Sequence, residues 1–286
     1  MYDGTVRDHE ASGTVDSQRR LQRGERAVNI FSAQTRGDPL IVLIPSPLLG
    51  PYSWSLVGEE LSARGWEVLV SVDLRDPLGG EPGWRQTTGG AAASLRAVPT
   101  DRSVALIGHS NAGPLLPAVG SSLPQPIVAY LFVDARLPHS GMSRLDAIEA
   151  EDPDGAAQRR ADLAAGRRYP AWTDEELREL IPDAERRRAL LAELRPRGAG
   201  YWTELLPTMS GWPDAPCGYL QFSAPYRSAA DRARRVGWPT HHLPAGHFHQ
   251  LVDPSAGVAA LAGLLAETGV PSPGSVTPAL QKGATT

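Results

Sequence analysis

Five apolar runs, rich in β-branched residues, occur along the chain. They are PLIVLIP (39–45), WEVLVSVDL (66–74), SVALIG (103–108), PIVAYLFV (126–133) and GYLQF (218–222). Such runs are largely continuous rather than alternating with polar residues, which is typical of strands buried on both faces of a parallel sheet. We therefore predict core strands at these positions.

Segments with a helical pattern lie between several of these runs. We predict helices over 53–65, 89–98, 113–123 and 254–269. The first carries apolar residues at helical spacing and stops at Gly65, and the last begins with proline and ends with glycine, as helices often do. Strands that alternate with helices predict an α/β fold, with a mostly parallel central sheet flanked by helices.

Residues 139–215 break this alternation. They are rich in Asp, Glu, Arg and Ala, and helical stretches lie near 143–150, 155–166, 173–181 and 183–195. We predict a helical cap (139–215) inserted between two late strands of an α/β core, which comprises residues 26–138 and 216–269. The polar, unpatterned ends, 1–25 and 270–286, are predicted to be disordered tails.

Composition limits the classes of function. The chain has 286 residues, a formal net charge of −4 and a single cysteine, Cys217, which leaves no intramolecular disulfide and no thiolate zinc site. The small net charge argues against nucleic acid or an acidic membrane as the main partner. We find no apolar stretch typical of a signal peptide or a membrane span, and we expect a cytoplasmic protein. Neither a nucleotide-binding glycine motif nor a dense metal-ligand cluster occurs, so no cofactor and no metal are predicted.

The stretch VALIGHSNAG (104–113) places Ser110 at an abrupt corner between a strand and a helix. The small residues around this serine are Gly108, Ala112 and Gly113. This is the pattern of a nucleophile elbow, in which small neighbours let strand and helix approach closely and the serine projects from the sheet. The backbone N–H of Asn111 would then face the same point. Ala112 stands where the common pattern has glycine, and a structural Gly-Ser turn is the alternative.

A nucleophilic serine needs a base. PTHHLPAGHFHQLVDP (239–254) supplies Gly246–His247 after a short strand-like run and just before the last helix. With this histidine the chain resembles the α/β-hydrolase fold superfamily from about Pro39 to Leu265. In that family the base follows the last strand, so the resemblance implies His247. The rival histidines are His241, His242 and His249.

The carboxylate that orients the base has two candidate positions. The family usually carries it after the strand predicted at 218–222, where this chain has Tyr226 at about the expected place and Asp231 further on. Some members carry it one strand earlier, and LFVDARLP (131–138) puts Asp134 where an apolar strand ends. A charged residue at that point needs a partner. We favour Asp134 as this carboxylate. The alternatives are that Asp231 is the acid, or that Asp134 only caps the loop that follows it.

The loop after the first core strand departs from the family pattern. The family usually has His-Gly-x there, and residue x donates a backbone N–H to the oxyanion. LIPSPLLGPYSW (43–54), aligned without a gap, puts Pro47 at x, and proline has no N–H. We predict that the Ser46 hydroxyl or the Leu48 N–H joins the Asn111 N–H as oxyanion donor. A one-residue slip in the alignment is the alternative.

The resemblance implies a cap-bearing serine hydrolase that cleaves an ester or thioester of a small, largely apolar molecule through an acyl-enzyme. The residues predicted to line its pocket are Leu48, Leu49, Trp54, Trp172 and Trp202, although aromatic residues in a small cap are more often its own core. Two alternatives remain open. One is a non-hydrolytic enzyme of the same fold (a lyase, cyclase or acyltransferase), which Pro47 favours, and the other is a non-catalytic ligand-binding relative.

Overall fold

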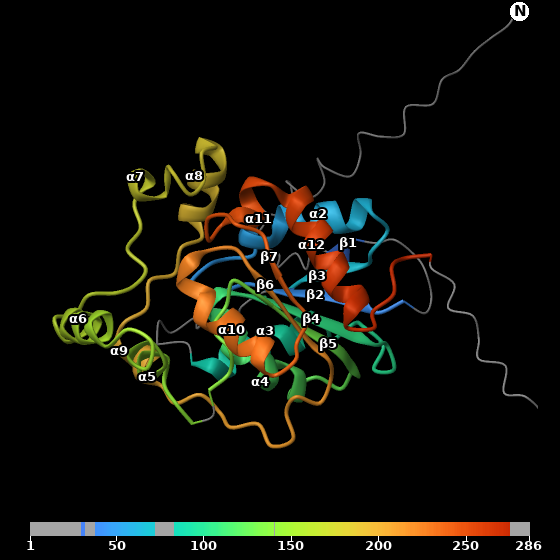
Figure 1. The fold of residues 1–286 in the computed structure, drawn as a ribbon, viewed down its shortest axis with the longest axis horizontal. Helices are drawn as coiled ribbons and strands as arrows, with labels where there is room; N and C mark the ends of the chain where they lie inside the picture. Colours follow the sequence, from blue (N-terminus) through green and yellow to red (C-terminus); the bar gives the residue numbers. More distant parts are fainter. Residues whose placement is uncertain (1–29, 32–37, 72–82, 140, 275–286) are drawn as a thin grey trace, which may run out of the picture.

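The computed structural model describes residues 30–31, 38–71, 83–139 and 141–274 of the 286-residue chain. Within these residues it contains one seven-stranded sheet in the order β1-β3-β2-β4-β5-β6-β7 (Figure 1). The strands are β1 (Ile30–Phe31), β2 (Leu40–Ile44), β3 (Val68–Val70), β4 (Val104–His109), β5 (Ile127–Val133), β6 (Cys217–Gln221) and β7 (Thr240–His242). All neighbouring pairs are parallel except β1–β3, at the sheet edge, which is antiparallel.

The central strands are buried on both faces, which accounts for their continuous apolar sequences. In β2, residues Leu40, Val42 and Ile44 belong to one core cluster and Ile41 and Leu43 to another. Successive side chains of a strand point to opposite faces of the sheet, so one apolar run supplies both clusters. The predicted mostly parallel sheet, flanked by helices, is thereby confirmed.

Helices cover the two faces of the sheet. The helices α2 (Tyr52–Ala63) and α12 (Pro254–Glu267) contribute apolar residues to one core cluster, and the short α11 (His249–Val252) contacts both of them. The helices α3 (Trp84–Ser94), α4 (Leu116–Ser121) and α10 (Arg227–Arg235), and the 3₁₀ helix η1 (Ser110–Leu115), belong to the opposite face. Figure 1 shows these two groups above and below the sheet.

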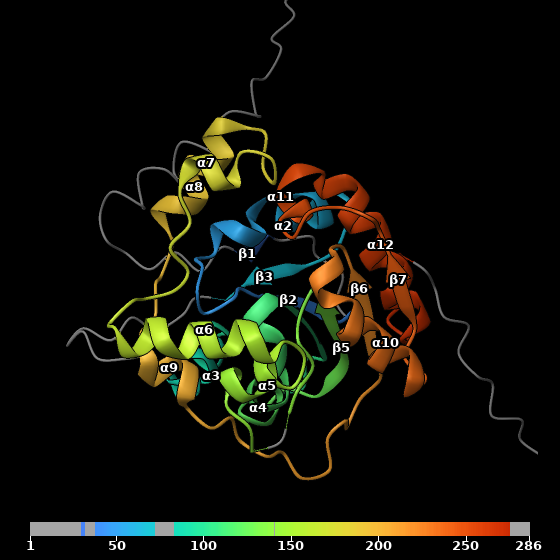
Figure 2. The same cartoon turned by 60° about the vertical axis from the view of Figure 1, so that its left-hand side comes forward.

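Five helices separate β5 from β6 in the described part of the chain. They are α5 (Arg144–Glu149), α6 (Pro153–Ala164), α7 (Asp174–Leu177), α8 (Ala184–Ala192) and α9 (Ala199–Thr203). Figure 2 shows two groups, α5 with α6 and α9, and α7 with α8, and the contacts between helices divide in the same way. Each group has its own small apolar cluster, to which Leu48 and Leu49 respectively contribute from the loop after β2.

The structure differs from the predicted elements mainly where these are short or rich in proline. The segment predicted as a helix over 113–123 begins as the 3₁₀ helix η1, which contains Pro114, and becomes α-helical only at Leu116. The helix predicted at 89–98 lies instead at Trp84–Ser94. The elements β1, α9 and α11 were not predicted, because two to five residues are too few to carry a periodic signal. The predicted tail 1–25, residues 275–286 of the predicted tail 270–286, and the end of the run 66–74 lie outside the described residues.

Candidate active site

Ser110 follows β4 directly and adopts a left-handed backbone conformation, with φ of 58°. A non-glycine residue in that region costs about 1–3 kcal/mol, so the surrounding structure must hold the turn in place. The two nearby glycines permit the close packing that does so. A Cβ on Gly108 would lie 2.9 Å from Leu116 Cδ2, and one on Gly113 would lie 2.5 Å from the carbonyl oxygen of Arg136.

Asp134 occupies the corresponding corner at the end of the neighbouring strand β5. It also has a left-handed backbone, with φ of 41°, and its side chain is completely buried. Its backbone N–H donates to the carbonyl of Leu220 at 2.7 Å. The Tyr219 hydroxyl holds the next residue, because it accepts from the Ala135 N–H at 3.2 Å and donates to the Ala135 carbonyl at 2.6 Å. These contacts fix the direction of the Asp134 carboxylate.

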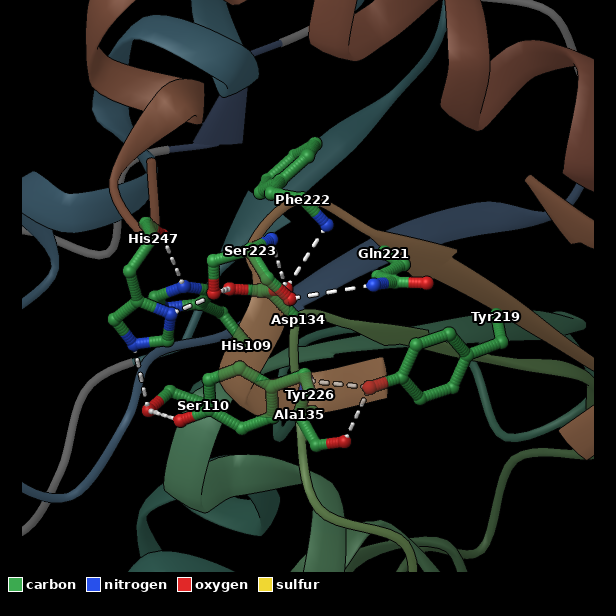
Figure 3. Close-up of polar contacts among 10 residues, drawn as sticks. All are labelled: His109, Ser110, Asp134, Ala135, Tyr219, Gln221, Phe222, Ser223, Tyr226 and His247. Atoms are coloured by element: carbon green, nitrogen blue, oxygen red, sulfur yellow. Dashed lines mark hydrogen bonds and ion pairs between the residues drawn. The ribbon is translucent and has the colours of Figure 1, made fainter. Parts of the chain in front are cut away.

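The Asp134 carboxylate accepts four hydrogen bonds (Figure 3). Oδ1 accepts from the backbone N–H groups of Phe222 and Ser223, both at 2.9 Å. Oδ2 lies 2.6 Å from the Ser223 hydroxyl and 2.7 Å from Nδ1 of His247. Burial acts to raise the pKa of Asp134, but the hydrogen bonds from His247 and Ser223 outweigh it and hold the pKa below its ordinary value. Asp134 is therefore an anion at neutral pH.

His247 lies in the loop between β7 and α11 and connects Asp134 with Ser110. Because an ionised carboxylate only accepts hydrogen bonds, Nδ1 of neutral His247 carries the hydrogen and donates it to Asp134. Nε2 is then an acceptor, and it lies 3.1 Å from Ser110 Oγ. The Ser110 hydroxyl consequently donates to Nε2, which is the orientation needed for proton transfer from a serine to a histidine.

The fully buried His109 contacts His247 through its ring and through a hydrogen bond to the backbone. The two rings lie 4.5 Å apart, and Nε2 of His109 lies 3.0 Å from the His247 carbonyl, to which it donates. Nδ1 of His109 has no hydrogen-bond partner among the described residues. Burial, followed by the nearby His247 ring, lowers the pKa of His109 to about 3, so its ring stays neutral at neutral pH.

Tyr226 is a site residue that the sequence reasoning did not assign to the site. Its hydroxyl lies 3.3 Å from Ser110 Oγ, and its ring stacks on that of His247, with centroids 5.0 Å apart and planes 9° apart (Figure 3). Because Ser110 donates its own hydrogen to His247, the phenol is the donor in the Tyr226–Ser110 contact. The only available signal was its position, in the loop where the family usually carries its acid.

Hydrogen bonds fix the loop after β2, which carries Ser46, Pro47 and Leu48. The Leu48 N–H lies 3.4 Å from the hydroxyl oxygen of the buried Ser46, while the Pro47 carbonyl accepts from the Arg197 guanidinium at 3.1 Å. Asn111 stands one residue into η1, so its backbone N–H has no acceptor within that helix. Asn111 and Leu48 both line the cavity described below, whereas Ser46 is not among its lining residues.

A cavity of about 610 Å³ opens above Ser110 and His247. Its walls come from the loops after β2, β4, β6 and β7 and from the α5–α9 segment. Among the predicted pocket residues, Leu48, Trp172 and Trp202 line it. Leu49 and Trp54 do not, which corrects two predictions. Leu49 packs with the α7–α8 cluster. Trp54 is buried between α2 and the sheet, where its indole N–H donates to the Ile44 carbonyl at 3.0 Å.

The rival candidates have other partners. Nε2 of His241 lies 2.7 Å from a Glu267 carboxylate oxygen, and Asp231 pairs with Arg234 on α10. His249 packs edge-on against Phe222. None of these residues, nor His242, lines the 610 Å³ cavity.

Comparison with known proteins identifies the architecture. No family model matches the sequence, and no curated protein does. Solved structures do match. An extracellular α/β-hydrolase from a Paenibacillus species, described as sharing homology with tobacco salicylic acid binding protein 2, superposes with a TM-score of 0.64, with 18% identity over 80% of this chain and 98% of that one. The chain has the α/β-hydrolase fold.

Further α/β-hydrolase-fold structures agree with this. Polyneuridine aldehyde esterase matches with a TM-score of 0.60 and 18% identity, over 79% of this chain and 99% of that one. Tomato methylketone synthase I, in complex with 2-tridecanone, matches with a TM-score of 0.59 and 11% identity, over 81% of this chain and 99% of that one. At such low identity the likeness concerns the fold, while reaction and substrate depend on the site. In the described part of the chain, no helix has the length and apolar character needed to cross a membrane.

Proposed function

We propose that this protein is a serine hydrolase that cleaves an ester or thioester of a small, largely apolar molecule through an acyl-enzyme. The observation that supports this most is the continuous series of hydrogen bonds from Ser110 through His247 to the buried Asp134. Nucleophile, base and orienting acid lie in the order that acyl transfer needs.

In the first half of the proposed reaction, Ser110 Oγ attacks the substrate carbonyl carbon while its proton passes to Nε2 of His247. The resulting imidazolium is stabilised by the Asp134 carboxylate, which remains ionised. When the tetrahedral intermediate collapses, the bond to the alcohol or thiol breaks and Nε2 returns the proton to the leaving group. The acyl group is then bound to Ser110 through an ester.

In the second half, His247 takes a proton from a water molecule that attacks the acyl carbon. The negative charge on the carbonyl oxygen is held in both halves by the Asn111 N–H and by a donor from the Ser46–Leu48 loop. Leu48 lines the cavity and Ser46 does not, while the Leu48 N–H lies 3.4 Å from Ser46 Oγ. The Ser46→Ala variant therefore distinguishes donation by the Leu48 N–H from donation by the Ser46 hydroxyl. When this second intermediate collapses, the bond between the acyl carbon and Ser110 Oγ breaks, Nε2 of His247 returns the proton to Oγ, and the acid is released.

The character of the cavity supports a small, mainly apolar substrate. About 610 Å³ is typical of a small-molecule site. The apolar residues that line it include Leu48, Trp172, Leu180, Trp202, Pro225 and Phe248. We propose that the α5–α9 segment serves as a cap, because α6, α7 and α9 each contribute residues to this lining.

A panel of p-nitrophenyl esters and matching thioesters of increasing acyl length tests the proposal. We expect turnover by the wild type and, with a slow substrate, an intact-mass increase equal to one acyl group on Ser110. Ser110→Ala should remain folded and lose up to about 10⁶ in rate, the scale set by a protease triad. Retention of most of the activity by Ser110→Ala would overturn the serine mechanism.

A second candidate, a non-hydrolytic enzyme of the same fold, is favoured by Pro47. Because proline lacks the N–H that usually serves the oxyanion, the site is less well equipped for ordinary acyl transfer. A lyase that uses only His247 and the cavity would need no acyl-serine. It would be recognised by dependence on His247 without any covalent adduct on Ser110, and with activity retained by Ser110→Ala.

A further inference from the structure

Tyr226 lies where its phenol can reach both Ser110 and a substrate bound in the cavity. Its hydroxyl lies 3.3 Å from Ser110 Oγ, and the residue lines the cavity. Its ring is parallel to the His247 ring, so the hydroxyl approaches Ser110 beside the imidazole and does not displace it. Proton transfer to His247 and a hydrogen bond from Tyr226 can therefore take place together.

The Tyr226 hydroxyl also stays protonated well above neutral pH, so it remains a hydrogen-bond donor there. Burial raises the pKa of Tyr226 to about 12, against a smaller opposing effect of the Ser110 hydrogen bond. When Ser110 Oγ forms a bond to carbon, it loses its ability to accept from the phenol as strongly as before. The carbonyl oxygen, bonded to the same carbon as Oγ, gains negative charge at that moment and becomes the better acceptor.

We propose that the Tyr226 hydroxyl is an additional oxyanion donor, which compensates for the backbone N–H that Pro47 lacks. This inference rests on the proposed acyl-transfer function. Its contribution is made in the transition state, because in the free enzyme the same hydrogen bond goes to Ser110 Oγ. The acid that the family usually carries in this loop is replaced by a neutral donor, while Asp134 orients His247.

Tyr226→Phe tests this proposal, since phenylalanine keeps the ring that stacks on His247. We expect kcat to fall about 10²- to 10³-fold with little change in KM, the effect of losing one oxyanion donor. A trifluoromethyl ketone that adds to Ser110 forms a similar oxyanion, so its inhibition constant should rise by a comparable factor. The affinity for an unreactive amide of the same shape should not change. Tyr130→Phe is the matched control, because it removes a hydroxyl that bonds Asp214 at 3.0 Å, away from the cavity.

A second variant guards against a folding defect in Tyr226→Phe. Replacement of Tyr226 by 3,5-difluorotyrosine keeps the hydroxyl but lowers the phenol pKa, so activity should fall at alkaline pH where the wild type is still active. Wild-type kcat and ketone affinity in Tyr226→Phe, together with an unshifted pH profile in the fluorinated protein, would overturn the Tyr226 role. If Ser110→Ala is inactive in the same assays, the hydrolase proposal survives that result. If Ser110→Ala is active, the hydrolase proposal itself fails.

An independent observation concerns Arg159 on α6. Its guanidinium lies over the Tyr169 ring at 4.3 Å and near the Trp202 ring at 4.9 Å, and all three residues line the cavity. The nearby Asp162 is engaged elsewhere, because it accepts hydrogen bonds from Gln158 and Tyr169 and forms an ion pair with Arg167. Among the described residues, Arg159 has no hydrogen bond or ion pair to a carboxylate.

This arrangement is suited to bind an anion. Two aromatic faces fix the plane of the guanidinium, while its N–H groups stay available for the planar, paired hydrogen bonds that carboxylates accept. Arg159 is partly buried, and a charge in that environment gains from a partner. Burial lowers the pKa of Arg159, but an arginine remains charged at neutral pH.

The structure assigns Arg159 to an anion subsite, so that the preferred substrate is an apolar ester or thioester with a carboxylate at its far end. This too rests on the proposed function. A series of p-nitrophenyl hemiesters of linear dicarboxylic acids, compared with neutral esters of equal length, finds the chain length at which the carboxylate is recognised. At that length we expect Arg159→Gln to lower kcat/KM for the hemiester about 10- to 100-fold, as a lost hydrogen bond to a charged group would, and to leave the neutral ester within about threefold.

Calorimetry separates this subsite from catalysis. Linear dicarboxylates should bind the wild type and bind Arg159→Gln more weakly, whether or not any ester is cleaved. Arg160→Gln is the control, because Arg160 is an exposed neighbour of Arg159 on α6, pairs with Glu149 of α5 and does not line the cavity. Equal preference for hemiester and neutral ester at every length, with no dicarboxylate binding, would overturn the subsite and leave the hydrolase proposal intact.

Discussion

The buried neutral His109 makes the stability of the protein depend on pH in a specific way. In the unfolded chain this histidine has an ordinary pKa of 6.5, and in the folded protein the pKa is about 3. Between these values the unfolded state binds one proton that the folded state does not. Stability therefore rises with pH across this window, and acid favours unfolding.

The magnitude follows from the two pKa values. Linkage for a single group gives a loss of about 2 kcal/mol between pH 7 and pH 5, and about 3 kcal/mol between pH 7 and pH 4. The loss is large because His109 is fully buried and its Nδ1 has no partner that could stabilise the cation. Total stabilities of about 5–15 kcal/mol are usual for a domain, so one histidine can remove a large part of the total.

Urea unfolding at several pH values, with His109→Gln as the comparison, isolates this effect. Glutamine places an amide N–H close to Nε2 of the histidine, so it can still donate to the His247 carbonyl, but it does not titrate. All other titrating groups are common to both proteins. We expect the difference in unfolding free energy, wild type minus variant, to become less favourable by about 3 kcal/mol from pH 7 to pH 4. Parallel curves would refute the reasoning, as would an NMR titration in which His109 protonates near pH 6.

Three further predictions concern the candidate site and the turn that carries Ser110. Asp134→Asn should lower kcat by up to about 10⁴ by favouring the wrong His247 tautomer, whereas Asp231→Asn should be nearly silent; the reverse ranking would return the acid to Asp231. Ser46→Ala should lower kcat about 10²- to 10³-fold with little change in KM, and a wild-type rate would assign the donation to the Leu48 N–H. Gly113→Ala should destabilise the protein by about 1–3 kcal/mol in urea unfolding, because its Cβ would meet the Arg136 carbonyl at 2.5 Å. Gly257→Ala, whose Cβ meets nothing within 4 Å, is the control and should not destabilise it.

The sequence predicts the sheet well because its signal is redundant. Every residue of β2 and β4 is buried, so each position of the apolar run carries the same information. The helices of the α5–α9 segment are short and their apolar faces narrow, so only their approximate positions follow from the pattern. The two-residue strand β1 carries no pattern, because its place depends on pairing with β3.

Pocket residues are harder to predict than the hydrogen-bonded series of Ser110, His247 and Asp134. A charged residue at the end of an apolar strand is unusual enough to be noticed, and this indicates Asp134. His247 instead follows from the resemblance to α/β-hydrolases, in which the base comes after the last strand. A tryptophan at helical spacing is compatible with a core or with a pocket wall. Trp54 proves to face the sheet, and that depends on how α2 packs. Tyr226 is the opposite case, because a tyrosine in a loop has no distinguishing neighbours in sequence and becomes significant only through its contact with Ser110.

Backbone strain at this site lies at the two residues that the proposed chemistry places at the strand ends. Among the described non-glycine residues, only Ser110 and Asp134 have positive φ, and each follows the last residue of one of two neighbouring strands. A residue continuing the strand would point its side chain into the helices that cover a face of the sheet. A left-handed residue instead turns the chain away, so the side chain can lie beyond the strand end. Each such turn costs about 1–3 kcal/mol. Four hydrogen bonds to the Asp134 carboxylate and the close packing permitted by Gly108 and Gly113 offset that cost. The two strained residues thus mark the same carboxyl ends of the strands at which the cavity and His247 lie, without knowledge of any reaction.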